Sequence, residues 1–265
     1  MEIEDKAEKT IEGYKQAFKT LSEVYSGGYS IHKVNRTAIW QIKAYLKNKG
    51  NRPATINSYL KRLRAAFKRL YLDDVIDKNP FQEFEPLYKP KDKQNIYTFD
   101  ELKRLLQILN SDKNRKLCRL MRISLFTGIR RGEVLNIERI DVNLGERFYR
   151  AINNKSKDKH KVWREIPNQV FDDFKYFMDL NPLLPYPFKV YKPNLYTCMT
   201  KKLLKRHRFH PDLHLHSFRH TAITRAIESG MDIREVQKII DHSRITVTEL
   251  YAHDKPKRAL DIGLE

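Results

Sequence analysis

Apolar residues recur at helical spacing through most of the first 88 residues, and this repeat restricts the possible folds more than any other feature. In the clearest case, residues 54–72, five apolar residues alternate at intervals of four and three: Ile56, Leu60, Leu63, Phe67 and Leu70. That spacing is typical of an amphipathic helix that buries one face. Similar stripes at residues 11–21 and 35–49 predict two more helices, so we expect an N-terminal helical bundle.

A stretch without periodicity follows this bundle. Residues 81–97 contain two prolines and clustered charges, which indicates a linker. Thr98 and Glu101 have the spacing of a capping box, which begins a new helix. We therefore expect a helical domain at residues 1–88, a linker at 89–94 and a second domain at 95–265.

The second domain combines helices with a small β-structure. Residues 147–153 and 162–167 are rich in β-formers and flank a lysine-rich segment, which predicts an antiparallel hairpin. Helical patterns precede and follow it. The expected fold is mainly α, with a mixed α+β second domain that contains this small antiparallel hairpin or sheet.

The charge of the chain indicates a polyanionic partner. Lysine and arginine total 52 against 33 acidic residues, which gives a net charge of +19. This excess favours double-stranded DNA, although a merely soluble basic protein could carry it too. One face of the helix at 54–72 is a candidate for contact with the phosphate backbone. Its cations are Lys61, Arg62, Arg64, Lys68 and Arg69.

Several classes of protein are disfavoured. The N-terminus has no apolar core, and no run approaches the roughly 18 apolar residues of a membrane helix. Cys118 and Cys198 lack a second thiol at metal-ligand spacing, so we expect free thiols and a cytoplasmic protein without membrane contact. Four histidines at 207, 210, 214 and 216 make zinc conceivable, but no cysteine accompanies them, and we expect no metal.

Residues with chemical potential gather in the second domain. His216 and Arg219 are three apart and would share one face of a helix. Arg130 follows Gly128 at an expected helix start, where backbone N–H groups favour phosphate. Further on come His242 and Tyr251. Each could be an ordinary surface residue, but together they provide anion-binding donors and a hydroxyl nucleophile for attack on a phosphodiester.

Four segments agree in order and spacing with a known family: TGIRRGEVL at 127–135, NNKSKDKHKVWREIP at 153–167, HSFRH at 216–220 and DHSRITVTELYAH at 241–253. On these residues the chain resembles the tyrosine recombinases, or phage-integrase family. It is most similar to minimal two-domain members of the Xer or mobile-element type. The resemblance implies that the first domain is a core-binding domain and the second is catalytic.

The resemblance also implies roles for individual residues. Arg130 and Arg219 would hold non-bridging oxygens of the scissile phosphate, and Glu133 would orient Arg130. His216 would donate a hydrogen bond or assist acid–base chemistry, and His242 would bind the same phosphate. Tyr251 would be the nucleophile that forms a 3′-phosphotyrosyl linkage.

The proton donor for the leaving 5′-oxygen is a hairpin lysine in this family. Lys155 with Ser156 best matches the family's pattern, so Lys155 is the expected donor. Counting back from Pro167 instead favours Lys157 or Lys159, and these alternatives stay open.

The implied activity is site-specific DNA recombination or integration, in which a tetramer exchanges strands through a four-way junction without a cofactor. A type IB topoisomerase and a catalytically silent DNA-binding protein remain alternatives. The sequence does not reveal the target DNA, accessory proteins, or the choice among integration, excision and chromosome-dimer resolution. Nor does it reveal whether residues 252–265 dock on their own protomer or on a neighbour.

Overall fold

A computed structural model describes residues 8–25, 30–88, 95–152, 161–180 and 182–240. Three expected site residues, Lys155, His242 and Tyr251, lie outside these ranges. The chain forms two compact units, Met1–Asp92 and Lys93–Glu265, and each is described by itself.

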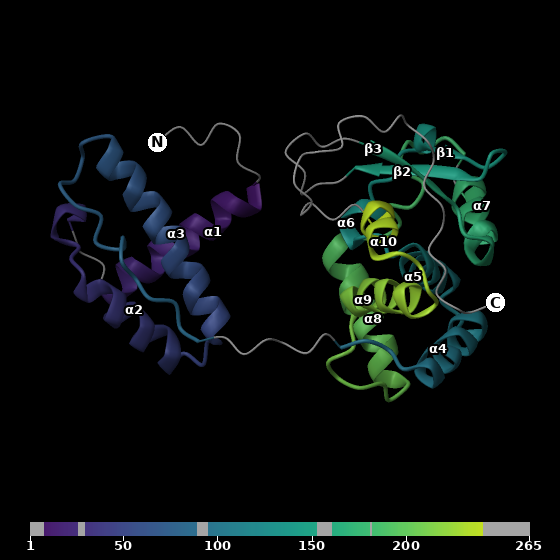
Figure 1. Cartoon of the computed structure of the whole chain (residues 1–265), viewed down its shortest axis with the longest axis horizontal. Helices are drawn as coiled ribbons and strands as arrows, with labels where there is room; N and C mark the ends of the chain where they lie inside the picture. The colour runs from purple at the N-terminus through teal and green to yellow at the C-terminus, as the bar shows by residue number, and fades with distance from the viewer. Residues whose placement is uncertain (1–7, 26–29, 89–94, 153–160, 181, 241–265) are drawn as a thin grey trace. The chain divides into compact units, whose positions relative to one another are not determined.

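The N-terminal unit is a helical bundle built on the apolar stripes (Figure 1). Its elements are α1 (Glu8–Val24), η1 (Ile31–Lys33), α2 (Thr37–Asn48) and α3 (Pro53–Leu72). Phe67 of α3 is fully buried and packs edge-on against Phe81, with ring centroids 4.9 Å apart. Asn57 of α3 bonds both backbone groups of Leu87 at 2.8 Å, so a buried amide ties the segment after the bundle to α3.

The C-terminal unit sets a small sheet against a group of helices (Figure 1). Its first part comprises α4 (Phe99–Ser111), α5 (Arg115–Thr127), α6 (Arg131–Val134) and η2 (Arg139–Asp141). The antiparallel strands β1 (Val142–Asn143), β2 (Phe148–Ile152) and β3 (Lys161–Glu165) follow, in that order across the sheet. The rest comprises η3 (Asn168–Val170), α7 (Phe171–Leu180), α8 (Pro193–Arg206), α9 (Leu215–Glu228) and α10 (Ile233–Ile239).

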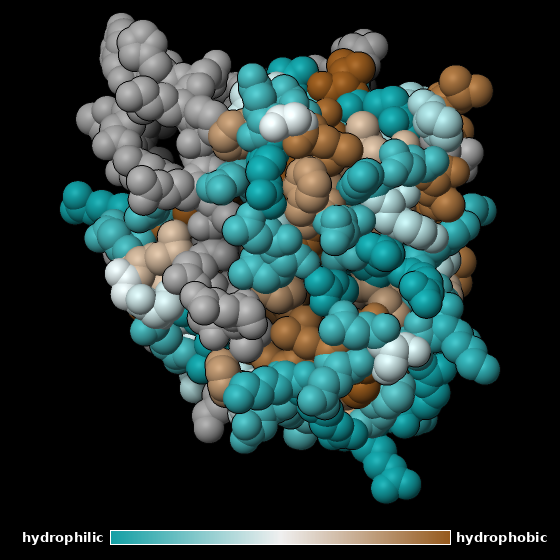
Figure 2. Space-filling model, turned by 90° about the vertical axis from the view of Figure 1, so that its right-hand side faces the viewer, coloured by the Kyte–Doolittle hydropathy of each residue, from teal (hydrophilic) through white to brown (hydrophobic). Residues whose placement is uncertain are grey.

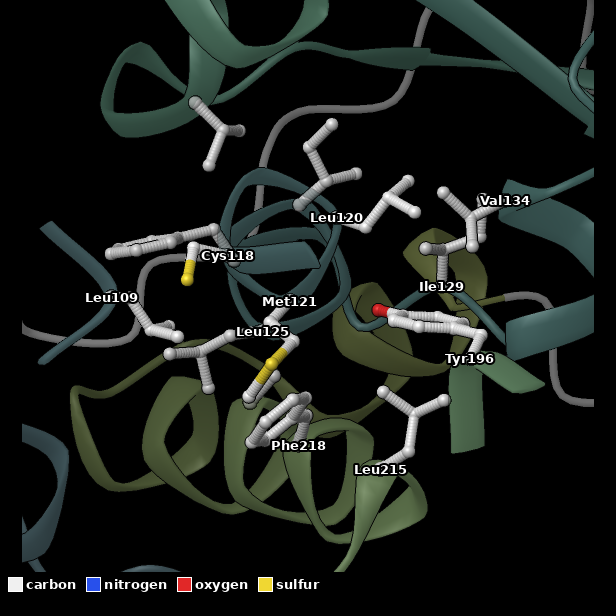
Figure 3. Close-up of a cluster of buried hydrophobic side chains, with 14 of the residues drawn as sticks. Leu109, Cys118, Leu120, Met121, Leu125, Ile129, Val134, Tyr196, Leu215 and Phe218 are labelled. Atoms are coloured by element: carbon white, nitrogen blue, oxygen red, sulfur yellow. The ribbon is translucent and has the colours of Figure 1, made fainter. Parts of the chain in front are cut away.

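Helix α5 is the centre of the C-terminal core. Leu120, Met121 and Leu125 of α5 are fully buried, and apolar side chains from α4, α8 and α9 surround them (Figure 3). Tyr196 of α8 is also fully buried, and its hydroxyl lies 3.0 Å from the Ser124 hydroxyl. Because α5 is enclosed on all these sides, its C-terminal end is held firmly, and the turn that follows it carries the site described below.

The expected fold class is confirmed: the chain is mainly α, with one small antiparallel sheet. The capping box is present, since Thr98 accepts from the Glu101 backbone N–H and Glu101 accepts from the Thr98 backbone N–H. Sequence analysis did not anticipate β1, whose two residues are too few to show a period. The helix expected to start at Arg130 is the short α6, with Arg130 as its N-cap.

Hydrophilic side chains cover most of the face of the C-terminal unit in Figure 2, and apolar side chains show between them. Among the described residues, no helix is long and apolar enough to cross a bilayer.

Candidate recombination site

The turn after α5 brings Arg130 to the start of a helix. Helix α5 ends at Thr127, and Gly128 follows with a positive φ of 61°. Glycine adopts this left-handed conformation at little cost, because it has no Cβ. The backbone of Arg130 is then extended, and this residue is the N-cap of α6. The reversal places Arg130 half-buried at the end of the central helix.

Glu133 holds Arg130 at two points. Its Oε1 accepts a hydrogen bond from Arg130 Nη1 at 2.6 Å, and its Oε2 accepts one from the Arg130 backbone N–H at 3.2 Å. Glu133 is only 2% exposed, so this charge-assisted contact is shielded from water. We expect this contact to orient Arg130.

Arg219 joins three segments that are distant in the sequence. It lies in the second turn of α9 and is 3% exposed. Its Nη1 donates to the Gly128 carbonyl at 2.6 Å, and its Nη2 donates to the Ile240 carbonyl at 2.8 Å. Gly128 is two residues before Arg130, so the two arginines expected to bind one phosphate lie at the same turn.

The electrostatics of this turn are those of an anion site. Burial and, less strongly, the neighbouring charge of Arg130 lower the pKa of Arg219 to about 10, while Glu133 opposes the change. Arg219 therefore keeps its charge at neutral pH. Two positive charges held together in a partly buried position favour the binding of an anion between or beside them.

His216 and His220 flank Arg219 on α9. His216 is exposed, and its ring lies 4.6 Å from that of His220 at nearly a right angle. Burial lowers the pKa of His220, and the charges of Arg219 and His214 lower it further. His220 is therefore neutral at neutral pH and can pack against His216 without adding charge. His220 is not among the predicted site residues, although it belongs to the HSFRH segment.

Lys161 is the first residue of β3 and lies within the described residues. Its Nζ lies 2.6 Å from Asp141 and 3.2 Å from Glu138. The hydrogen bond to Asp141 is the main cause that raises its pKa, against the effect of burial. Lys161 is thus committed to an ion pair. The candidate proton donor Lys155 and its alternatives lie outside the described residues.

The cations expected to contact DNA divide into two groups on α3. Lys61, Arg64 and Lys68 are exposed at helical spacing along one face. Arg62 is half-buried against α1, where a Cβ at Gly13 would come within 2.7 Å of its Nε. Arg69 pairs with Asp73 at 2.9 Å. The first group is better placed to contact a phosphate backbone.

We expect DNA binding to depend on this exposed face. Replacing Lys61, Arg64 and Lys68 together by glutamine should reduce the slope of log affinity against log salt by about 2–3, because each lost phosphate contact removes about one unit. Titration of a labelled duplex at several salt concentrations measures the slope. Arg36→Gln is the control, since Arg36 already pairs with Glu83 at 3.2 Å. An unchanged slope in the triple variant would exclude this face from the interface.

Within the described ranges, no group of three or more His, Cys, Asp or Glu side chains is arranged to hold a metal ion. Both cysteines are free. Cys118 is buried, which raises the pKa of its thiol to about 11, and Cys198 is exposed.

Comparison with known proteins identifies the family. The phage integrase SAM-like domain matches residues 1–89, and the phage integrase family matches residues 188–258. A probable integrase/recombinase of Acholeplasma phage L2 is 30% identical over 247 residues, which cover 87% of this chain and 81% of the phage protein. The chain belongs to the tyrosine recombinase (phage integrase) family. The predicted family is thereby confirmed, and so is the prediction that the chain is a recombinase.

Other relatives extend over nearly the whole recombinase. The tyrosine recombinase XerA of Thermococcus kodakarensis is 26% identical over 95% of this chain and 86% of its own length. The solved structure of the Tn1549 transposon integrase with circular intermediate DNA has a TM-score of 0.75 at 21% identity and covers 92% of this chain and 89% of its own. A lambda integrase dimer bound to a core site has a TM-score of 0.72 at 15% identity, over 95% and 94%. These structures share the fold of the recombinase.

Proposed function

We propose that the recombinase breaks and rejoins double-stranded DNA at specific sites through a covalent bond between DNA and Tyr251. The observation that carries this proposal is the pair of hydrogen bonds from Arg219 to Gly128 and Ile240. They place Arg219 at the turn that carries Arg130, and they hold the last described residue of the chain against the same side chain. His242 follows Ile240 by two residues, which span at most about 7 Å of chain.

In this proposal, Arg130 and Arg219 bind non-bridging oxygens of the scissile phosphate. A guanidinium offers five N–H donors, more than the two that the Gly128 and Ile240 carbonyls take from Arg219. Charge on those oxygens increases in the transition state, so donors already held in place stabilise it without further reorganisation. His242 adds a hydrogen bond to the same phosphate.

Tyr251 performs the cleavage. A free phenol has a pKa near 10, and a cationic pocket lowers the cost of forming the phenolate. The phenol oxygen attacks phosphorus, its proton passes to a neighbouring base such as His216, and the bond from phosphorus to the 5′-oxygen breaks. Lys155, or in its place Lys157 or Lys159, protonates the leaving oxygen. Attack by another 5′-hydroxyl reverses the step, so the bond energy is conserved and the chemistry calls for neither ATP nor a metal.

The exchange is proposed to occur in a tetramer on two paired sites, strand by strand through a four-way junction. The N-terminal unit would act as the core-binding domain, with Lys61, Arg64 and Lys68 along the backbone. DNA as the substrate and two free cysteines support a cytoplasmic location.

Covalent trapping tests the proposal. The bound sequence is first selected from random duplexes, and a nicked duplex of that sequence, from which the cleaved strand end escapes, is then incubated with the recombinase. A covalent adduct is expected, and plasmids with two sites should recombine while plasmids with one site should not. Relaxation of one-site plasmids without recombination would favour a topoisomerase, and binding without an adduct would favour a silent DNA-binding protein.

A further inference from the structure

The buried residue of strand β3 is a cation. Arg164 is 2% exposed, whereas the other residues of Lys161–Glu165 are all partly exposed. Its Nε and Nη2 have no hydrogen-bond partner within the part of the chain that the structure describes. Burying a charge is costly unless the charge is paired, so this arginine needs an explanation.

The surroundings of Arg164 lead to the recombination site. Tyr149 is its direct cross-strand neighbour on β2 and is 1% exposed. Burial raises the pKa of the Tyr149 hydroxyl, whereas the charge of Arg164 and hydrogen bonds with Arg164 and Thr127 lower it. Thr127 is the last residue of α5, and Gly128 beside it accepts the hydrogen bond from Arg219. A buried contact path thus runs from Arg164 through Tyr149 to the turn.

The charges around this turn do not balance. Arg130 and Arg164 both act on Arg219, and Glu133 is the carboxylate that opposes them. Glu133 is already engaged by Arg130. Among the described groups at this turn, three guanidinium groups are therefore balanced by one carboxylate. This leaves an excess of positive charge around Arg219. Such an excess is useful where an anion has to bind.

We infer that Arg164 is a positioning residue of the recombinase: it supports the Thr127–Gly128 turn through Tyr149, and its charge, which no carboxylate among the described residues pairs, favours the phosphate and the phenolate of Tyr251. It is buried, so it can act without touching DNA. The inference deepens the proposed function and rests on it. Arg164 is thus added to the two arginines that are expected to hold the phosphate.

Two variants separate the charge of Arg164 from its packing. Arg164→Met removes the charge at similar volume, and Arg164→Lys keeps the charge. Arg150→Met is the matched control, since Arg150 is on β2 next to Tyr149 but pairs with Asp141. Asp141 keeps Lys161 as a partner in that variant.

Arg164→Met should slow single-turnover cleavage of the nicked duplex by about 10- to 100-fold. This is less than the roughly 10²- to 10³-fold for loss of a donor that touches the transition state, because Arg164 acts without touching the phosphate. Its pH–rate profile should move to higher pH by about one unit, because the site in which the phenolate is proposed to form then carries one positive charge fewer. The charged and titratable groups at this turn are Arg130 at the start of α6, Glu133 on α6, Tyr149 on β2 and Arg219 on α9. Thermal stability should change little, because the benefit of removing a buried charge offsets the loss of the hydrogen bond with Tyr149. Arg164→Lys and Arg150→Met should keep the pH profile of the unmodified enzyme.

A purely structural role predicts different results. Arg164→Met would then unfold at lower temperature, and its cleavage rate would fall only with the folded fraction, without a shift in pH profile. Unchanged cleavage in Arg164→Met would also overturn the inference while leaving the proposed function intact.

If the unmodified enzyme forms no adduct, the proposed function is what fails, and anion binding then tests Arg164. Sulfate, compared with chloride at equal ionic strength, should raise the unfolding temperature of the unmodified protein more than that of Arg164→Met. Equal protection would overturn the inference.

Discussion

A Tyr251→Phe variant is expected to bind the selected DNA site as tightly as the unmodified recombinase and to form no covalent adduct with it. The substitution removes one oxygen, which is the nucleophile of the proposed reaction, and leaves the ring. Removing the nucleophile of a covalent enzyme lowers its rate by about 10⁴-fold or more, because the remaining groups cannot replace it. Denaturing electrophoresis of the labelled nicked duplex measures the adduct, and a mobility-shift titration measures binding.

Tyr186→Phe is the matched control for this experiment. Tyr186 is exposed in the same unit, 37% by relative area, and it is not part of the candidate site. It should form the adduct at the rate of the unmodified enzyme. An adduct that persists in Tyr251→Phe would show that another residue attacks phosphorus, and peptide mapping of the adduct would then identify it.

The elements whose signals are local could be predicted from the sequence. The stripe at residues 54–72 became α3, and the capping box at Thr98 and Glu101 begins α4. The hairpin was also anticipated from its flanking β-formers, and its strands pair with Tyr149 opposite Arg164. In each case the residues that carry the signal follow one another closely in the sequence, or lie in two strands joined by one short segment.

Features that depend on tertiary contacts could not be predicted in this way. The five cations of α3 look alike in the sequence, yet Arg62 packs against α1 while Lys61, Arg64 and Lys68 face outward. The hydrogen bonds of Arg219 join residues that are 91 and 21 positions away. No short pattern records such pairs.

The candidate site shows the same division. Order and residue type indicated Arg130, Glu133, His216 and Arg219, and the structure places Arg130, Glu133 and Arg219 around one turn, with His216 one helical turn before Arg219. Arg164 carried no comparable signal, because an arginine in a short strand beside a lysine-rich tip is usually exposed. Its burial became evident only from the structure, in which Arg164 lies opposite the buried Tyr149 of β2.

Replacing Arg219 is expected to have the second largest effect on cleavage. Arg219→Lys keeps a charge, but an ammonium cannot reproduce the planar donor set that bonds Gly128 and Ile240 together with a phosphate. Cleavage should fall by about 10²- to 10³-fold, the range for loss of a preorganised donor. Arg219→Met should also lower the free energy of unfolding by about 1–3 kcal/mol for each buried carbonyl left unpaired. Single-turnover cleavage and urea unfolding measure the two effects separately.

Arg225→Met shows which part of the loss is structural. Arg225 lies on the same helix and donates to the Tyr97 carbonyl at 3.1 Å, but it is not part of the candidate site. It should lose stability through its unpaired carbonyl and cleave at the unmodified rate once the protein is folded. If Arg219→Lys cleaved at that rate as well, the hydrogen bonds of Arg219 would be a structural link between α5 and α10, and the phosphate would have to be bound elsewhere.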